Sequence, residues 1–201
     1  MVVVDLDGTL IKANSFVLFY RFLFSATLRR WRLLDTGRIC AWALLRRMRL
    51  ISHRRFKWEI MKVADAVLLD GDYNIFAEEL INFINPRVGE YVSAHKDVVL
   101  ATAASVEYAS ELARHLGIRY CVATERPPSL RFKDYVECRG SEKVRRVSEA
   151  LPDCRITEAI TDHMDDLPLL LAAYGKQVLV NPASSTLAAA TEAGLKPEIW
   201  E

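Results

Sequence analysis

Apolar residues follow two different spacings in two parts of the chain. Between about residue 14 and residue 94 they recur at steps of three and four, beginning with Phe16, Phe19, Tyr20, Leu23 and Phe24. Such spacing places apolar side chains on one face of a helix. We therefore predict several helices in this stretch, separated at Gly37, at Ser52 and in the turn at residues 70–72.

The remainder of the chain alternates short apolar runs with helical patterns. Short buried strands are predicted at 2–4, 98–101, 118–123, 156–161 and 177–180. Helices are predicted between them at 106–116, 141–151 and 167–173. This alternation is typical of an α/β fold, in which a parallel sheet carries helices on both faces. The helical stretch at 14–94 then reads as an insertion after the first strand.

Composition limits the class of protein. Half of the residues are hydrophobic (51%) and the net charge is +1, which argues against disorder and gives no bulk charge for binding nucleic acid. The cysteines at 40, 121, 138 and 154 show no CxxC spacing, so free thiols in a reducing compartment are expected. No signal peptide or membrane-spanning run is evident, and a cytoplasmic protein is expected.

Polar residues stand where the predicted strands end. Asp5 and Asp7 follow the first strand, Thr102 follows the second, and an acidic segment at 162–166 follows the fourth. Ligands of open α/β sheets bind outside the carboxyl ends of the strands. These side chains, with Lys143 near the start of a helix, are therefore expected to share one rim of the sheet.

This set of residues suits phosphoryl transfer. A carboxylate such as Asp5 can attack phosphorus and form an acyl phosphate. Two unit charges about 4 Å apart interact by about 4 kcal/mol at an effective dielectric near 20, so a cation must offset the repulsion. Mg²⁺ with its hard oxygen ligands is the expected cofactor, held by Asp5, Asp162 and the backbone carbonyl of Asp7, with Asp166 or Asp165 acting directly or through water.

The other residues take complementary roles. Asp7 is spaced to protonate the leaving alkoxide and then to activate water. Lys143 is expected to offset charge on the transferred group, Thr102 to donate a hydroxyl to a phosphate oxygen, and Gly8 to turn the chain tightly and offer its N–H. The predicted catalytic residues are thus Asp5, Asp7, Thr102 and Lys143.

Residues 5–10 (DLDGTL), Thr102, Lys143 and residues 161–166 (TDHMDD) resemble, in order, the four motifs of the haloacid dehalogenase superfamily. The resemblance extends over nearly the whole core and is strongest to the phosphoserine-phosphatase-like branch. It implies a Rossmann-like core at 1–13 and 95–201, a mobile helical cap at 14–94, and an Mg²⁺-dependent phosphatase. Phosphoserine-specific relatives carry a glutamate where this chain has Asn14, which argues against phosphoserine.

Two other functions remain open. A phosphotransferase or phosphomutase of the same superfamily would pass the phosphoryl group to another hydroxyl rather than to water. A membrane-associated or scaffolding protein would keep the fold without turnover, although intact Asp5, Asp7, Lys143 and Asp162 argue against it. Dehalogenases lack the second acid of the first motif, so Asp7 favours a phosphatase.

Basic residues concentrate in the predicted cap. Between residues 21 and 62 there are twelve Lys or Arg and only two acids, Asp35 and Glu59, a net charge of +10. On a helix, Arg38, Arg46 and Arg49 would share one face with Trp42 nearby. Three interpretations stand: steering of an anionic small-molecule or lipid phosphate substrate, peripheral contact with the anionic inner membrane surface, and a plain solvated helical face. Nucleic acid is not expected, because no recognition pattern accompanies the charge.

Overall fold

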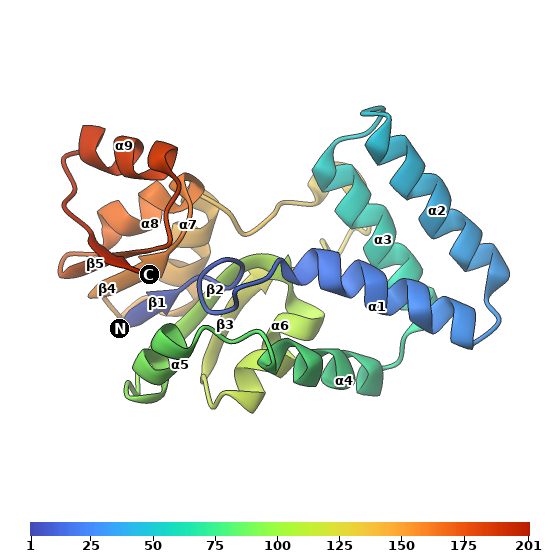
Figure 1. The fold of residues 1–201 in the computed structure, drawn as a ribbon, viewed down its shortest axis with the longest axis horizontal. Coiled ribbons are helices and arrows are strands. Elements are labelled where there is room, and N and C mark those ends of the chain that lie inside the picture. The colour runs from blue at the N-terminus through green and yellow to red at the C-terminus, as the bar shows by residue number, and fades with distance from the viewer.

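A single sheet of six parallel strands forms the centre of the protein in the computed structural model, which describes residues 1–201 (Figure 1). The strand order is β3-β2-β1-β4-β5-β6. Their bounds are β1 Val2–Val4, β2 Val98–Ser105, β3 Tyr120–Thr124, β4 Glu158–Thr161, β5 Lys176–Val180 and β6 Glu198–Trp200. β1 pairs with β2 and β4, so Val3 lies opposite Val99 and Ala159. The predicted α/β fold with a Rossmann-like parallel sheet is confirmed.

Helices cover both faces of the sheet (Figure 1). One face carries α5 (Pro86–Ser93) and α6 (Val106–His115), and the other carries α7 (Ser141–Ala150), α8 (Leu167–Ala172) and α9 (Ser184–Glu192). Alternate residues of β1 enter the two cores, since Val2 and Val4 belong to the larger apolar cluster and Val3 to the smaller. Burial on both faces explains why β1 is apolar throughout.

The inserted segment begins with three helices that project away from the sheet (Figure 1). They are α1 (Ser15–Arg29), α2 (Leu33–Arg47) and α3 (His53–Val67). Asn14 and Ser52 cap α1 and α3 by accepting hydrogen bonds from the Val17 and Arg55 amides at 3.0 and 3.1 Å. No helix in the structure combines the length and the apolar character needed to cross a bilayer.

The rest of the insertion lies against the sheet layer. α4 (Asp70–Ile81) packs along α6, and Val88 and Val92 of α5 belong to the same apolar cluster as β1. The projecting part of the molecule therefore consists of α1, α2 and α3. The division into a 14–94 cap and a core of 1–13 and 95–201 remains a prediction.

Several local predictions were wrong. Gly37 does not separate helices but lies inside α2, because a helix tolerates one glycine at modest cost. Arg49 lies beyond α2 with a left-handed φ of 60°, so it does not share a helical face with Arg38 and Arg46. β2 extends to Ser105 across a register shift, which places Thr102 inside the strand rather than after it. α9 and β6 had not been predicted.

Candidate active site

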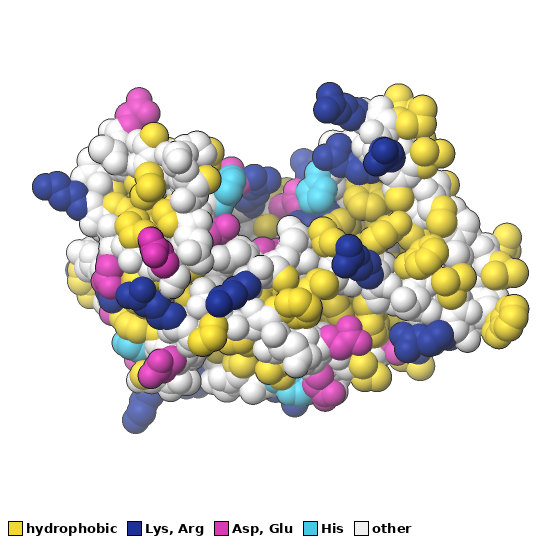
Figure 2. Space-filling view, in the orientation of Figure 1, with side chains coloured by type: hydrophobic (Ala, Val, Ile, Leu, Met, Phe, Trp, Pro, Cys, Tyr) yellow, Lys and Arg dark blue, Asp and Glu magenta, His cyan; other side chains and the backbone are white.

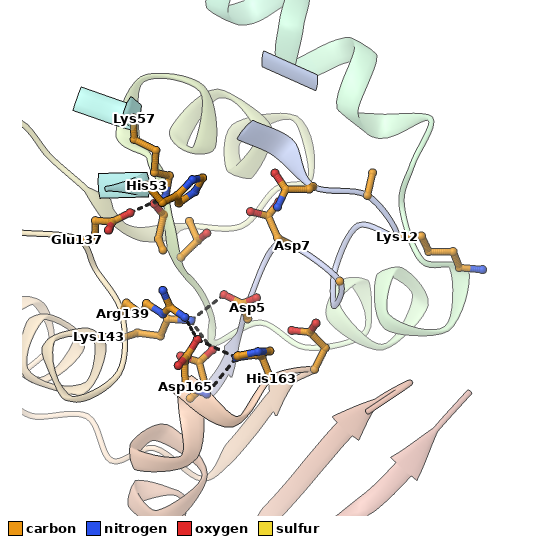
Figure 3. A pocket seen from close by; sticks show the side chains of 17 residues that line it. Asp5, Asp7, Lys12, His53, Lys57, Glu137, Arg139, Lys143, His163 and Asp165 are labelled. Atoms are coloured by element: carbon orange, nitrogen blue, oxygen red, sulfur yellow. Dashed lines mark hydrogen bonds and ion pairs between the residues drawn. The ribbon is translucent and has the colours of Figure 1, made fainter. Parts of the chain in front are cut away.

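A polar cavity of about 440 Å³ opens at the carboxyl ends of β1, β2 and β4, beneath the first turn of α3 (Figure 3). In Figure 2 it lies in the hollow between the sheet domain and the projecting helices. Its lining includes all of the residues predicted to be catalytic, phosphate-binding or metal-binding, namely Asp5, Asp7, Gly8, Thr102, Lys143, Asp162 and Asp166. Residues more than 150 positions apart in the chain thus converge, because parallel strands present their carboxyl ends at one rim.

A buried ammonium group joins two of these carboxylates. Lys143 Nζ donates to Asp5 Oδ1 at 2.7 Å and to Asp166 Oδ2 at 2.5 Å. Lys143 lies in the first turn of α7, which Gly140 introduces with a φ of 59°. The Thr161 hydroxyl also donates to Asp166 Oδ2 at 2.9 Å. Asp166 therefore holds the lysine in place, and Thr161 holds Asp166.

The environment of Asp5 opposes its ionisation. Burial raises its pKa from 3.8 to about 7, although the Lys143 ammonium pulls in the opposite direction. The Asp5 amide donates to the Ile160 carbonyl at 3.0 Å, which keeps the residue in line with the sheet. Asp5 is thus a fixed, desolvated carboxylate with a cation on one side and open cavity on the other, an arrangement suited to a nucleophile.

Asp7 is held by the start of the insertion. Its Oδ1 accepts a hydrogen bond from the Ser15 amide at 2.6 Å, at the first residue of α1. Burial raises the pKa of Asp7, while the bond from Ser15 lowers it by a smaller amount. A carboxyl group with a raised pKa is a better proton donor at neutral pH, in keeping with a general acid.

Gly8 brings the backbone against Asp162. Its φ is 77°, and a Cβ built on it would lie 2.2 Å from Asp162 Oδ2. Only glycine meets both demands, because any side chain would strain the left-handed backbone and collide with the carboxylate. Thr9 Oγ1 donates to the other oxygen, Asp162 Oδ1, at 3.4 Å. Burial raises the pKa of Asp162.

Thr102 is buried with its hydroxyl proton unused by the protein. Its Oγ1 accepts from the Ala104 amide at 3.0 Å, at the irregular part of β2. Because this bond occupies an acceptor site, the hydroxyl hydrogen stays available for a ligand in the cavity. Its position in the cavity lining is compatible with the predicted role of a donor to a phosphate oxygen.

The donors present fit a magnesium ion. No three His, Cys, Asp or Glu side chains gather closely enough to form a metal cluster by themselves. Mg²⁺ does not require one, since it keeps several waters and is often bound through one or two carboxylates. Asp5 and Asp162 supply hard carboxylate oxygens to the same cavity. Asp7, two residues after Asp5, lines this cavity as well, and its backbone carbonyl is the third predicted ligand. Asp166 is engaged by Lys143 and Thr161, which suits an indirect role.

Sequence reasoning missed several residues of the opposite wall (Figure 3). Lys57 of α3 donates to Glu137 Oε1 at 2.7 Å and to the Ala103 carbonyl at 3.0 Å, which ties α3 to the sheet domain. His53 lines the cavity one turn earlier in α3, and burial lowers its pKa. No motif marks these positions, because they enter the site only through the folding of the insertion.

The exposed edge of the cavity holds a second polar group. Arg139 forms an ion pair with Asp165, and His163 Nδ1 lies 2.8 Å from Asp165 Oδ2. Asp165 is therefore turned toward Arg139 and His163, whereas Asp166 is buried beside Lys143. Of the two candidate acids, the geometry places Asp166 at the centre of the site.

Comparison with known proteins shows the family of the chain. The family model described as "haloacid dehalogenase-like hydrolase" matches residues 2–171. The fold, the site and this match define the class, and the chain belongs to the haloacid dehalogenase-like hydrolase family. No curated protein matches the chain.

Solved structures share the fold at low sequence identity. A protein of unknown function from Bordetella pertussis Tohama I superposes with a TM-score of 0.76 at 18% identity, over 100% of this chain and 97% of that one. A phosphoserine phosphohydrolase-like protein from Francisella tularensis has a TM-score of 0.53 at 17% identity, over 98% and 93%. The HAD-hydrolase YfnB from Bacillus subtilis, described as bound to magnesium, has a TM-score of 0.50 at 14% identity, over 100% and 92%.

Proposed function

We propose that this hydrolase is an Mg²⁺-dependent phosphatase that cleaves a phosphate monoester through an aspartyl-phosphate intermediate at Asp5. The observation that carries the proposal is the buried contact of 2.7 Å between Asp5 Oδ1 and Lys143 Nζ, at the carboxyl end of β1. It leaves a carboxylate aimed into a cavity lined almost entirely by polar groups. The likeness to phosphatase-like structures supports the proposal.

In the first step an Asp5 oxygen attacks phosphorus and the bond to the ester oxygen breaks. Lys143 offsets charge on the transferred group, while the Thr102 hydroxyl and the Gly8 amide donate to its oxygens. The proton of Asp7 goes to the leaving alkoxide, which departs as an alcohol. The Ser15 amide, 2.6 Å from Asp7 Oδ1, keeps this acid in position.

In the second step Asp7, now ionised, accepts a proton from water. That water attacks the phosphorus of the aspartyl phosphate, and the bond between phosphorus and the Asp5 oxygen breaks. Inorganic phosphate leaves, and Asp5 and Asp7 return to their starting states. When bound by Asp5, Asp162 and the Asp7 carbonyl, Mg²⁺ supplies the positive charge that lets a carboxylate approach a phosphate dianion.

The substrate class is an anionic small molecule or lipid that carries a phosphate monoester. Asn14 lies in the cavity lining where phosphoserine-specific relatives carry a glutamate, so no carboxylate stands there to bind a substrate amine. Lys57 and Arg139 also line the cavity, but Glu137 and Asp165 pair with them, so the case for an anionic substrate rests on the reacting phosphate.

A panel of phosphate monoesters, including lipid phosphates and phosphoserine, tests the proposal with Mg²⁺ present or chelated. Phosphate release is expected for at least one ester, to require Mg²⁺, and to fall at least about 10³-fold in Asp5→Asn. Asp153→Asn, which changes an exposed acid outside the cavity, is the matched control and should retain full activity.

Two results would reject this assignment. Undiminished phosphate release by Asp5→Asn would remove the nucleophile from its role. Transfer of the phosphoryl group to a second hydroxyl without phosphate release would instead show a phosphotransferase or mutase.

A further inference from the structure

The outermost helix of the molecule, α2, carries apolar residues on the side that faces solvent. Leu34, Ala41 and Leu44 lie on this side at spacings of seven and three, with Gly37 between them and Met48 directly after the helix. Trp31, at the turn before the helix, is 83% exposed and Leu34 is 87% exposed. A surface helix ordinarily turns its apolar stripe toward the core and its polar residues outward.

This exposed stripe is additional to the one that packs inward. Ile39 of α2 is fully buried, and α2 packs against α1 and α3. The outer stripe therefore is not needed to hold α2 in place. Contiguous exposed apolar residues of this kind mark a surface that meets a partner. Leu33 at the start of α2 and Leu50 beyond its end are also exposed.

Basic groups flank the stripe (Figure 2), and neither acid between residues 21 and 62 is free. Asp35, one of the two acids between residues 21 and 62, is buried and engaged by Arg32 and Arg38. The other, Glu59, is also buried and is engaged by Arg55 and Lys62. Exposed arginines that form no ion pair stand at both ends of α2, namely Arg29, Arg47 and Arg49. The surface is thus apolar along its middle and cationic around it.

We propose that residues 29–50, the cap surface, bind peripherally to an anionic lipid bilayer. An interfacial helix inserts an apolar face at the headgroup boundary and keeps its basic residues against anionic headgroups. Trp31 suits that boundary, because an indole ring has an apolar body and one polar N–H. Juxtamembrane arginines then add attraction to anionic lipid.

Charge argues against a second copy of this chain as the occupant. Steps of three and four also describe a helix-pairing seam, and α2 could in geometry pair with another α2. Such pairing would bring two cap surfaces together, each with seven arginines and one buried acid, Asp35, a net charge of +6. Like charges at a close interface disfavour association, whereas an anionic bilayer can bury the apolar middle of the surface and neutralise its cationic rim.

The cap surface contains none of the catalytic residues, although its last residue lies near a cavity residue in the sequence. Leu50 precedes by three residues His53, which lines the cavity from α3. No residue from 29 to 50 lines the cavity. Membrane binding is therefore expected to be independent of turnover, and Asp5→Asn should bind vesicles as the wild type does.

Flotation of the full chain with vesicles tests the proposal. Binding to phosphatidylcholine vesicles that contain about 30 mol% phosphatidylglycerol is expected to be at least about tenfold tighter than to pure phosphatidylcholine. Raising salt from about 0.1 M to about 1 M shortens the screening length from about 10 Å to about 3 Å and should weaken binding. Brominated lipids should quench tryptophan fluorescence in the wild type and less so in Trp31→Asn, because Trp58 and Trp200 are buried and Trp42 is half-buried in α2.

Two sets of variants separate the apolar from the cationic contribution. Trp31→Asn with Leu34→Ser should weaken binding at least about tenfold. Asn tolerates the left-handed backbone of Trp31, where φ is 54°, so the fold should be kept. Replacing Arg29, Arg47 and Arg49 by Gln should weaken it about a hundredfold, at about fivefold each.

Matched controls come from the sheet domain. Tyr174→Ser removes an exposed aromatic residue, and Arg119→Gln with Lys196→Gln removes exposed charge; both variants should bind as the wild type does. Absence of vesicle binding, or binding that cap and control variants share equally, would overturn the proposal. A dimer in sedimentation that Leu34→Ser dissociates would overturn it as well, because a second copy would then cover the surface.

Discussion

The cavity and the cap surface place charged groups in opposite circumstances. In the cavity, Lys143 is buried and compensated by Asp5 and Asp166 within 2.7 Å. On the cap surface, Arg47 and Arg49 are exposed and form no ion pair. Buried charges must be paired or they destabilise the fold, whereas exposed charges cost little and stay free for a partner. The buried, paired charges therefore belong to the candidate active site, and the exposed, unpaired charges belong to the proposed membrane-binding surface.

The largest expected effect follows from removing the buried cation. Lys143→Met leaves Asp5 and Asp166 without compensation and should lower the free energy of unfolding by about 3–5 kcal/mol, measured by denaturant titration. The loss should grow as pH rises, because burial raises the pKa of Asp5 to about 7 and its carboxylate then ionises without a counterion. Lys196→Met, at an exposed position, should stay within about 0.5 kcal/mol of the wild type. Equal stability of the two variants would mean that the lysine is not a structural counterion.

Glycine substitutions sharpen the same contrast with a smaller effect. Gly8→Ala should destabilise the protein by about 2 kcal/mol and lower activity, because a Cβ meets Asp162 Oδ2 at 2.2 Å in a left-handed backbone. Gly37→Ala places the same methyl group in open space on α2, with nothing within 4 Å, and should stabilise the helix by up to about 1 kcal/mol. Thermal unfolding of both variants checks the pair. A Gly8→Ala protein as stable as Gly37→Ala would contradict the tight turn.

Magnesium binding should depend on pH through Asp5. A metal ion competes with the proton for the carboxylate, and burial raises the pKa of Asp5 to about 7. Affinity for Mg²⁺ should therefore rise up to about tenfold per pH unit below pH 7 and level off above it. Calorimetric titration with Mg²⁺ at several pH values between about 6 and about 8.5 measures this change in affinity. Affinity that falls as pH rises, or a pH dependence unchanged in Asp5→Asn, would contradict the assignment.

The rim of the sheet could be predicted from sequence because its residues are local to strand ends. Asp5 and Asp162 each follow a short apolar run, and parallel strands bring such positions together whatever the surrounding helices do. The partnership of Lys143 with Asp166 was not predicted, since it depends on how far α7 lies above the sheet.

The opposite wall could not be predicted for a different reason. Lys57 and Glu137 lie 80 positions apart, and neither stands at a strand end. The folding of the insertion alone brings them together. The pattern also failed to show that Thr102 lies within β2, because a register shift has no signature in composition.

Trapping of the acyl phosphate tests the central claim most directly. Asp7→Asn should still accept a phosphoryl group from p-nitrophenyl phosphate, whose leaving group needs no proton, but should hydrolyse the intermediate slowly. Borohydride reduction followed by peptide mass analysis should then find homoserine at position 5 and aspartate at position 162. An unmodified position 5 in a protein that still releases nitrophenol, or reduction at position 162 instead, would contradict Asp5 as the nucleophile.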